Sequence, residues 1–219
     1  MERYGTPEVL ELRDVPTPTP RANEVLVRVH AASVNDWDWG LLRGTPFVIR
    51  ILHGLFAPKV RIIGGDIAGH VEAVGEDVKR FRPGDEVYGD LCMSGFGAFA
   101  EYACALEASL ALKPPGMTFE QAAAIPQAGM LAVQGLIDVG GIRSGQKVLV
   151  NGAGGGVGTF ALLRACAESQ RHLCHRRRQH PAPVTATGLQ SVAIPFVQQT
   201  PAHRLLEAEQ RPCLPERAV

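Results

Sequence analysis

The chain has 219 residues, and its 22 acidic side chains balance its 22 lysines and arginines, so its formal net charge is zero. This balance gives no indication of a nucleic-acid or membrane-surface partner. The absence of any run of 18 apolar residues excludes a transmembrane helix, and the charged, proline-rich start has no apolar segment typical of a signal peptide. Because the five cysteines have no repeated spacing, we expect a cytoplasmic protein in a reducing compartment, with no nucleic-acid and no membrane partner.

The first half of the chain has the pattern of short strands separated by turns. Valines occupy every second position from 25 to 29 within residues 24–35, which is the period of a half-buried strand. Residues 67–75, 85–91 and 97–105 have a similar character, with glycine- and proline-containing turns between them. These closely spaced strands predict a compact, barrel-like all-β unit over about residues 1–112.

An alanine-rich helical pattern follows. Thr118 and Gln121 form a capping box, which predicts the start of a helix. Pro126 should break or kink that helix, and a second helix is expected over about residues 129–139. The continuous apolar run at 145–150 then predicts a strand that is buried on both faces, as in a parallel sheet.

The segment VLVNGAGGGVGTF, residues 148–160, predicts a strand that leads into a glycine-rich turn and a helix. Glycines lack Cβ, so a phosphate can approach the backbone and the positive end of the following helix. Alanine stands where the standard dinucleotide-binding fingerprint has its first glycine. The alternative is an ordinary glycine-rich turn between a strand and a helix. The residues that we expect to bind the cofactor are Gly152, Ala153, Gly155, Gly156, Val157 and Gly158.

The last 55 residues, 165–219, differ from the rest of the chain. They contain one of the 24 glycines and no Lys, Asp, Tyr or Trp, and they show too little periodic apolar pattern for a core, which predicts a disordered tail. Their composition resembles the product of a shifted reading frame or an altered splice. The cysteines and histidines between 166 and 180 do not have the spacing of a standard metal-binding finger. A further interpretation of the chain, as a nucleic-acid binder, would use the basic run Arg176–Arg178.

Six stretches between residues 4 and 161 follow the order and spacing of a known family. They are YGTPEVLELRDVPTPTP, NEVLVRVHAASVNDWDWGLLRG, GGDIAGHVEAVGEDVKRFRPGDEVYGD, GAFAEYA, MTFEQAAAIPQAG and GQKVLVNGAGGGVGTFA. On these stretches the chain resembles a medium-chain dehydrogenase/reductase, most of all the zinc-independent branch of quinone oxidoreductases and NADP-dependent alcohol dehydrogenase-like reductases. The resemblance implies an α+β to α/β protein. Residues 1–116 would form a GroES-like β-barrel catalytic domain, residues 117–164 the beginning of an incomplete NAD(P)-binding Rossmann domain (parallel α/β), and residues 165–219 the atypical tail.

The resemblance also bears on zinc. Zinc-dependent members place a catalytic cysteine where this chain has SVNDWD, and Gly-His-Glu where it has Gly64–Gly65–Asp66. The four-cysteine structural lobe is reduced to Cys92. Because zinc needs three or four converging nitrogen or sulfur ligands, we expect no zinc. His30 and His70 are expected to be strand residues that face solvent or a local acceptor.

In this branch of the family, the stretch SVNDWDW borders the active cleft. The candidate catalytic residues are therefore Asn35, which would hydrogen-bond the nicotinamide or substrate, and Asp38, which would orient Asn35 or nearby backbone. Alternatively, each would form an Asx turn that caps a helix beginning near Trp37. Asp66 would support the same pocket or stabilise a turn. Where the family often has a threonine that contacts the nicotinamide, this chain has Leu131.

The function implied by the resemblance is hydride transfer from a nicotinamide cofactor to a small-molecule quinone, activated alkene or carbonyl. NADPH is favoured over NADH, the chain could form a homodimer, and activity would be impaired if the second domain were incomplete. The alternative is a catalytically inactive GroES-like fragment that acts as a binding or regulatory module.

Overall fold

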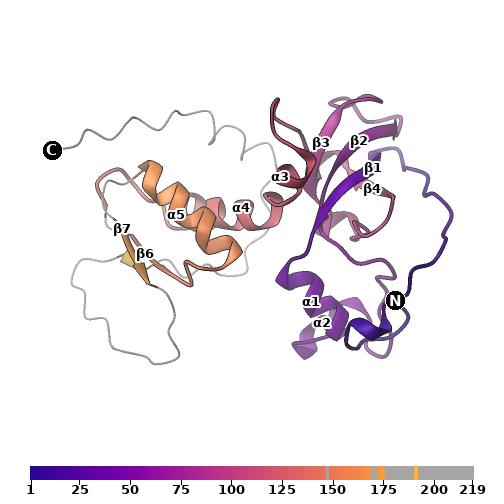
Figure 1. The fold of residues 1–219 in the computed structure, drawn as a ribbon, viewed down its shortest axis with the longest axis horizontal. Helices are drawn as coiled ribbons and strands as arrows, with labels where there is room; N and C mark the ends of the chain where they lie inside the picture. The colour runs from indigo at the N-terminus through magenta and orange to yellow at the C-terminus, as the bar shows by residue number, and fades with distance from the viewer. Residues whose placement is uncertain (147, 169–171, 176–189, 192–219) are drawn as a thin grey trace. The chain divides into compact units, whose positions relative to one another are not determined.

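The computed structural model describes residues 1–146, 148–168, 172–175 and 190–191 (Figure 1). The chain divides into two compact units between Gln127 and Ala128. The first unit contains a sheet of antiparallel strands, and the second contains a small parallel sheet.

The sheet of the first unit has five strands in the order β4-β1-β2-β3-β5. Three of the predicted strands form within two residues of their expected ends, whereas the expected strand at 97–105 begins only at Tyr102, and β5 had no sequence signal. The strands are β1 (Glu24–Ser33), β2 (Asp66–Val74), β3 (Glu86–Asp90), β4 (Tyr102–Leu106) and β5 (Leu110–Leu112).

The core of this sheet consists of apolar side chains from all five strands and from the segments between them. Val25 and Val27 are fully buried, as their alternation predicts, but Leu26 between them is 7% exposed, so β1 is covered on both faces near its start. In the second half of β1, exposed and half-buried residues alternate. The other buried members are Ile67, Val71, Phe81, Val87, Leu91, Ala98, Ala103, Ala105 and Leu110.

Two short helices, α1 (Asp36–Arg43) and α2 (Phe47–His53), follow β1 and lie together near one end of the sheet (Figure 1). Gly44 ends α1 with a φ of +59°, a left-handed conformation that favours glycine. The two helices bury Leu41, Leu42 and Ile49 against Ile63 and Phe96. The connecting segments carry three 3₁₀ turns, Pro7–Val9, Cys92–Ser94 and Glu107–Ser109.

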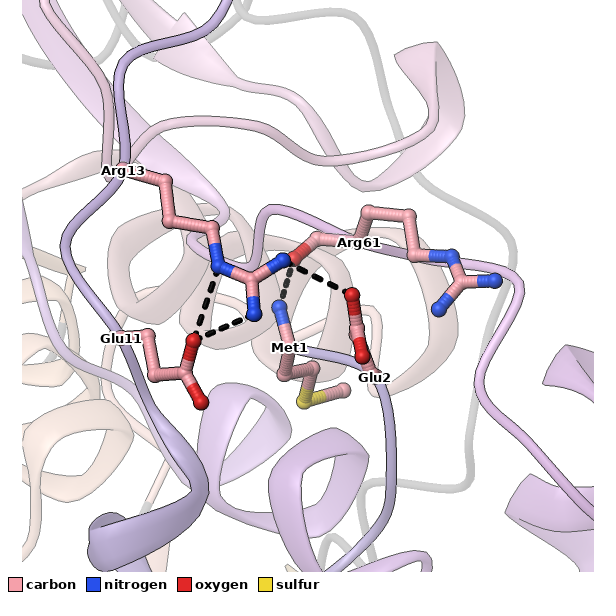
Figure 2. Close-up of polar contacts among 5 residues, drawn as sticks. All are labelled: Met1, Glu2, Glu11, Arg13 and Arg61. Atoms are coloured by element: carbon pink, nitrogen blue, oxygen red, sulfur yellow. Dashed lines mark hydrogen bonds and ion pairs between the residues drawn. The ribbon is translucent and has the colours of Figure 1, made fainter.

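Polar contacts hold the N-terminal segment on the surface of the first unit (Figure 2). The amino group of Met1 donates to the carbonyl of Arg61. The guanidinium of Arg13 donates to Glu2, with Nη1 at 2.8 Å from Oε1, and to Glu11, with Nε at 2.8 Å from Oε2. All three side chains are more than half exposed.

The helical region after the sheet begins as predicted and then differs in detail. Thr118 and Gln121 form the capping box of α3 (Phe119–Ala123). Pro126 does interrupt the helical run, but it does so as the first residue of α4 (Pro126–Val133), which therefore starts three residues earlier than expected. Proline suits this position because the first helical N–H has no partner within the helix. A π-helical turn, Gln134–Val139, completes the segment.

The second unit has a parallel sheet in the order β7-β6-β8, with helix α5 packed beside it. Val148 of β6 lies in a core with Leu136, Ile142 and Ala161. The sequence did not predict β7 and β8, which pair with β6 and lie within residues 165–219. The proposed Arg176–Arg178 patch and most of that tail lie outside the described residues. The elements are β6 (Val148–Asn151), α5 (Gly156–Glu168), β7 (His172–His175) and β8 (Gln190–Ser191).

Candidate functional site

The glycine-rich turn connects β6 to α5 through a backbone path that depends on two of its glycines. Gly152 has a φ of +80°, and its carbonyl accepts the Gly155 N–H at 3.0 Å. At Gly158, a Cβ would come within 2.3 Å of the Gly152 carbonyl oxygen and 2.6 Å of the Ala153 Cα. Only glycine fits where two backbone segments approach this closely.

Two other positions of the turn leave open space. A Cβ at Gly154 would meet nothing within 4 Å, and one at Gly155 would meet only the Gly152 carbonyl at 3.5 Å. Val157 packs against the core that contains Val148, which anchors the first turn of α5. Since α5 has no acidic residue in its first turn, the helix dipole and the first N–H groups offer a positive end to an anion.

A second polar site lies in the first unit, where β1 ends and β2 begins. The Asn35 amide nitrogen donates to Asp66 Oδ2 at 3.0 Å and to Ser33 Oγ at 3.3 Å. Ser33 Oγ donates to the same Asp66 oxygen at 3.2 Å, and the Gln127 N–H lies 3.2 Å from both Asp66 oxygens. The structure therefore brings Asn35 and Asp66 into one hydrogen-bonded cluster.

Asp38 lies beside this cluster but is held by backbone groups. Its Oδ2 accepts the Asn35 N–H at 2.8 Å, which fixes the start of α1, and its Oδ1 accepts the Gly64 N–H at 3.1 Å. Asp38 is 2% exposed, and burial raises the pKa of its carboxyl above the ordinary value despite these donors. These contacts fit both roles considered for Asp38, orienting the backbone at Asn35 and capping helix α1.

Asp66 and Asp90 face each other across the β2–β3 ladder, and both are buried. Loss of hydration is the main cause that raises the pKa of Asp66 to about 8, and the nearby Asp90 raises it further, against the hydrogen bonds from Asn35, Gln127 and Ser33. Burial also raises the pKa of Asp90. The site thus holds carboxyl groups that favour the protonated form more than exposed ones do.

Cys92 forms hydrogen bonds with two residues of this cluster. Its N–H donates to Asp90 Oδ1 at 2.8 Å, and its sulfur accepts from the Gln127 amide nitrogen at 3.3 Å. Burial is the main cause that raises the pKa of the Cys92 thiol, so it stays protonated. The sequence prediction missed the roles of Ser33, Asp90 and Gln127; the register of β2 and β3, once known, would have placed Asp90 opposite Asp66.

His30 and His70, which were expected to be strand residues facing solvent or a local acceptor, lie in β1 and β2. His70 Nδ1 and His30 Nε2 are 3.0 Å apart, and the His30 ring stacks on Phe119. At Gly65, where zinc-dependent relatives carry histidine, a Cβ would lie 3.3 Å from Cys92 Sγ and 3.4 Å from Asp90 Oδ1. Within the described ranges, no group of three metal-ligating side chains is gathered in one place.

Comparison with known proteins identifies a known type of domain within the first unit. Residues 21–115 match the family model of the alcohol dehydrogenase GroES-like domain. The chain is 39% identical over 160 residues to the quinone oxidoreductase of Sus scrofa and 38% identical over 159 residues to that of Homo sapiens, covering 73% and 72% of this chain and 46% of each relative. It therefore spans about half the length of the curated relatives that it matches.

Solved structures agree. The quinone oxidoreductase from Coxiella burnetii superposes with a TM-score of 0.68 at 34% identity, covering 79% of this chain and 53% of the other. The Escherichia coli quinone oxidoreductase complexed with NADPH superposes with a TM-score of 0.65 at 27% identity, covering 79% and 49%.

These findings define the first unit as a GroES-like domain of the alcohol dehydrogenase type. The chain belongs to the medium-chain dehydrogenase/reductase superfamily, in its quinone oxidoreductase-like branch, as the resemblance implied. In the part of the chain that the structure describes, no helix has the length and apolar character needed to cross a membrane.

Proposed function

We propose that this protein binds a nicotinamide dinucleotide, NADPH in preference to NADH, and transfers its hydride to a small-molecule quinone, activated alkene or carbonyl. The observation that carries the proposal is the glycine turn before α5, whose backbone path requires Gly158 and whose outer positions leave room for a phosphate. The E. coli relative that was solved with NADPH supports the choice of cofactor.

In this proposal the pyrophosphate lies against the turn formed by Gly152, Ala153, Gly155, Gly156, Val157 and Gly158. Helix N-termini stabilise anions through their free N–H groups and dipole, and no carboxylate in the first turn of α5 opposes this. The bound nicotinamide supplies the hydride. Asn35 is the proposed residue that hydrogen-bonds the reacting part of the ligand, Asp38 orients Asn35 through its backbone N–H, and zinc has no role.

The apolar surface beside α1 supports the proposed substrate class. Helix α2 and the residues after it expose apolar side chains that would lie against the ring of a quinone or the chain of an alkene. The most exposed are Phe47, Ile51 and Leu52, each at 62%, and Phe56 at 92%. A cytoplasmic location and a homodimer are part of the same proposal.

Calorimetric titration with NADPH tests the cofactor site. In Gly155→Val the branched side chain occupies the open space of the turn, so we expect NADPH to bind at least about tenfold more weakly, because one charge-assisted hydrogen bond is worth about 1.5–3 kcal/mol. The Cβ of this variant meets nothing closer than 3.5 Å in the protein, so the fold should be kept.

The control is Leu163→Ala, on an exposed position of helix α5, which follows the turn, and it should leave the affinity unchanged. Equal affinities for the wild type and Gly155→Val would show that the turn does not bind the cofactor. No binding by the wild type, with the fold intact, would favour the alternative of a GroES-like binding or regulatory module.

A further inference from the structure

Asp66 is a fully buried carboxyl group in a small polar cluster, and three of the groups around it are hydrogen-bond donors. Ser33 Oγ, the Asn35 amide nitrogen and the Gln127 N–H all lie within 3.2 Å of its oxygens. Its solvent exposure is zero. A carboxyl group in this position exchanges its proton with the exterior through one of these partners.

Ser33 is the partner that can carry a proton. It is the last residue of β1 and is only partly buried. Its hydroxyl group both donates and accepts, whereas the amides of Asn35 and Gln127 hold their protons. When Asp66 is ionised, the serine O–H donates to it; when Asp66 is protonated, its O–H donates to Ser33 Oγ and the serine O–H turns outward.

We propose that Ser33 and Asp66 form the proton-donating pair for the reduction of a quinone or carbonyl oxygen. This inference rests on the proposed function. A bound nicotinamide would supply a hydride, which carries two electrons and one hydrogen, and one substrate oxygen would then be negatively charged. Ser33 O–H gives its proton to that oxygen, and Asp66 returns a proton to Ser33. After the product leaves, Asp66 takes up a proton from water along the same path.

The groups around Asp66 are consistent with a stored proton. Asp66 is paired with Asp90 on the neighbouring strand, and the Asp90 carboxyl group accepts the Cys92 N–H. Asp38 lies at the start of α1. Burial and the charge of Asp90 raise the pKa of Asp66 to about 8, and the pKa values of Asp38 and Asp90 are raised as well. A carboxyl group with this pKa is protonated at neutral pH and can serve as a general acid.

The first test measures the pKa of Asp66 directly and needs no turnover. It uses the Asn35 side chain as the probe, because the chain contains only three asparagines, Asn23, Asn35 and Asn151. In the full-length chain labelled with ¹⁵N-asparagine, each side-chain NH₂ group gives a resolvable pair of signals. The Asn35 pair, assigned by its loss in Asn35→Ser, should shift with pH with a midpoint near 8. Asp66→Asn should abolish this titration. A midpoint below about 5, the range of an ordinary aspartate, would overturn the proposal.

The second test measures reduction of 1,4-benzoquinone by NADPH in the full chain. Ser33→Ala should lower kcat about 100-fold or more, the usual contribution of a general acid, with little change in KM, and Ser33→Thr should restore most of it. The wild-type rate should fall as pH rises through about 8, and this fall should disappear in Ser33→Ala. Ser109→Ala, which removes a different partly buried hydroxyl, serves as the control.

The outcomes separate the two proposals. If the wild type reduces the quinone and Ser33→Ala does so at the same rate, the donor pair is wrong and the proposed function stands. The same holds if Ser33→Thr behaves like Ser33→Ala, because then the hydroxyl group is not what matters. If the wild type binds NADPH and still reduces no quinone, carbonyl or alkene, the proposed function fails and the donor role fails with it.

Discussion

The two candidate sites of this protein are built in opposite ways. In the first unit, side chains make the site: Asn35, Ser33 and Asp66 are fixed to one another, and Asp38 and Gln127 tie them to the backbone. In the second unit the backbone makes the site, because the glycines of the turn have no side chains and Gly158 is held against Gly152. We therefore expect pH to change the stability of the first site, because its carboxyl groups titrate. We expect added side-chain volume to change the stability of the second site, because its backbone segments are in close contact.

This difference can be measured separately in the two units. Both tryptophans, Trp37 and Trp39, lie in α1 of the first unit. Tryptophan fluorescence therefore follows the unfolding of the first unit, whereas the circular dichroism of the helices includes α5. A change confined to the second unit should therefore move the circular dichroism signal and leave the tryptophan fluorescence unchanged.

The largest effect is expected for Gly158→Val. Its side chain would overlap with the Gly152 carbonyl and the Ala153 backbone, neither of which belongs to a flexible side chain, so we expect a loss of about 3 kcal/mol, the upper range for overpacking. The helical signal should melt earlier, while the tryptophan transition stays in place. Gly154→Ala is the control, because its Cβ meets nothing within 4 Å. A stable Gly158→Val chain would show that the turn adjusts freely.

The second effect concerns pH and the first unit. Asp66 has a raised pKa of about 8 in the folded state, so the folded protein binds more protons than the unfolded one between about pH 4 and pH 8, and stability falls as pH rises through this window. Between pH 6.5 and 8 the loss should be up to about 2 kcal/mol, since one pH unit corresponds to about 1.4 kcal/mol. His53, whose pKa is lowered by burial, acts in the opposite direction up to about pH 7.5, because the unfolded imidazole still binds part of a proton there.

Denaturant titrations followed by tryptophan fluorescence at several pH values measure this slope. In Asp66→Asn the slope should become shallower, because only the smaller contributions of Asp38 and Asp90 remain. An unchanged slope in Asp66→Asn would mean that Asp66 is ionised in the folded protein at neutral pH.

The sequence predicted what depends on local pattern. Alternating valines marked β1, and the capping box at Thr118 marked α3. The glycine turn was located from its own residues, because glycine spacing is a local property. Strand β5, with three residues, is too short to show a period of two.

Properties that depend on distant residues were not predicted. The pairing of Asp66 with Asp90 depends on the register of two strands, and the contact of Asp66 with Gln127 joins residues 61 positions apart. The sequence of β7, His-Leu-Cys-His, resembles no buried strand, and its partner β6 lies on the other side of α5 in the sequence. Asn35 and Asp38 were placed by resemblance, and their local contacts became clear only with the fold.

The smallest effect is expected at the N-terminal segment, which belongs to neither site. Arg13 forms ion pairs with Glu2 and Glu11 on the surface (Figure 2), and its hydrogen bond lowers the pKa of Glu2. Water and salt screen exposed pairs, and holding long side chains in place costs entropy, so most of the attraction is offset. Arg13→Ala should therefore leave the denaturation midpoint of the first unit within experimental error at 0.15 M salt. A clear drop in the tryptophan transition would show that the segment before β1 is an integral part of that unit.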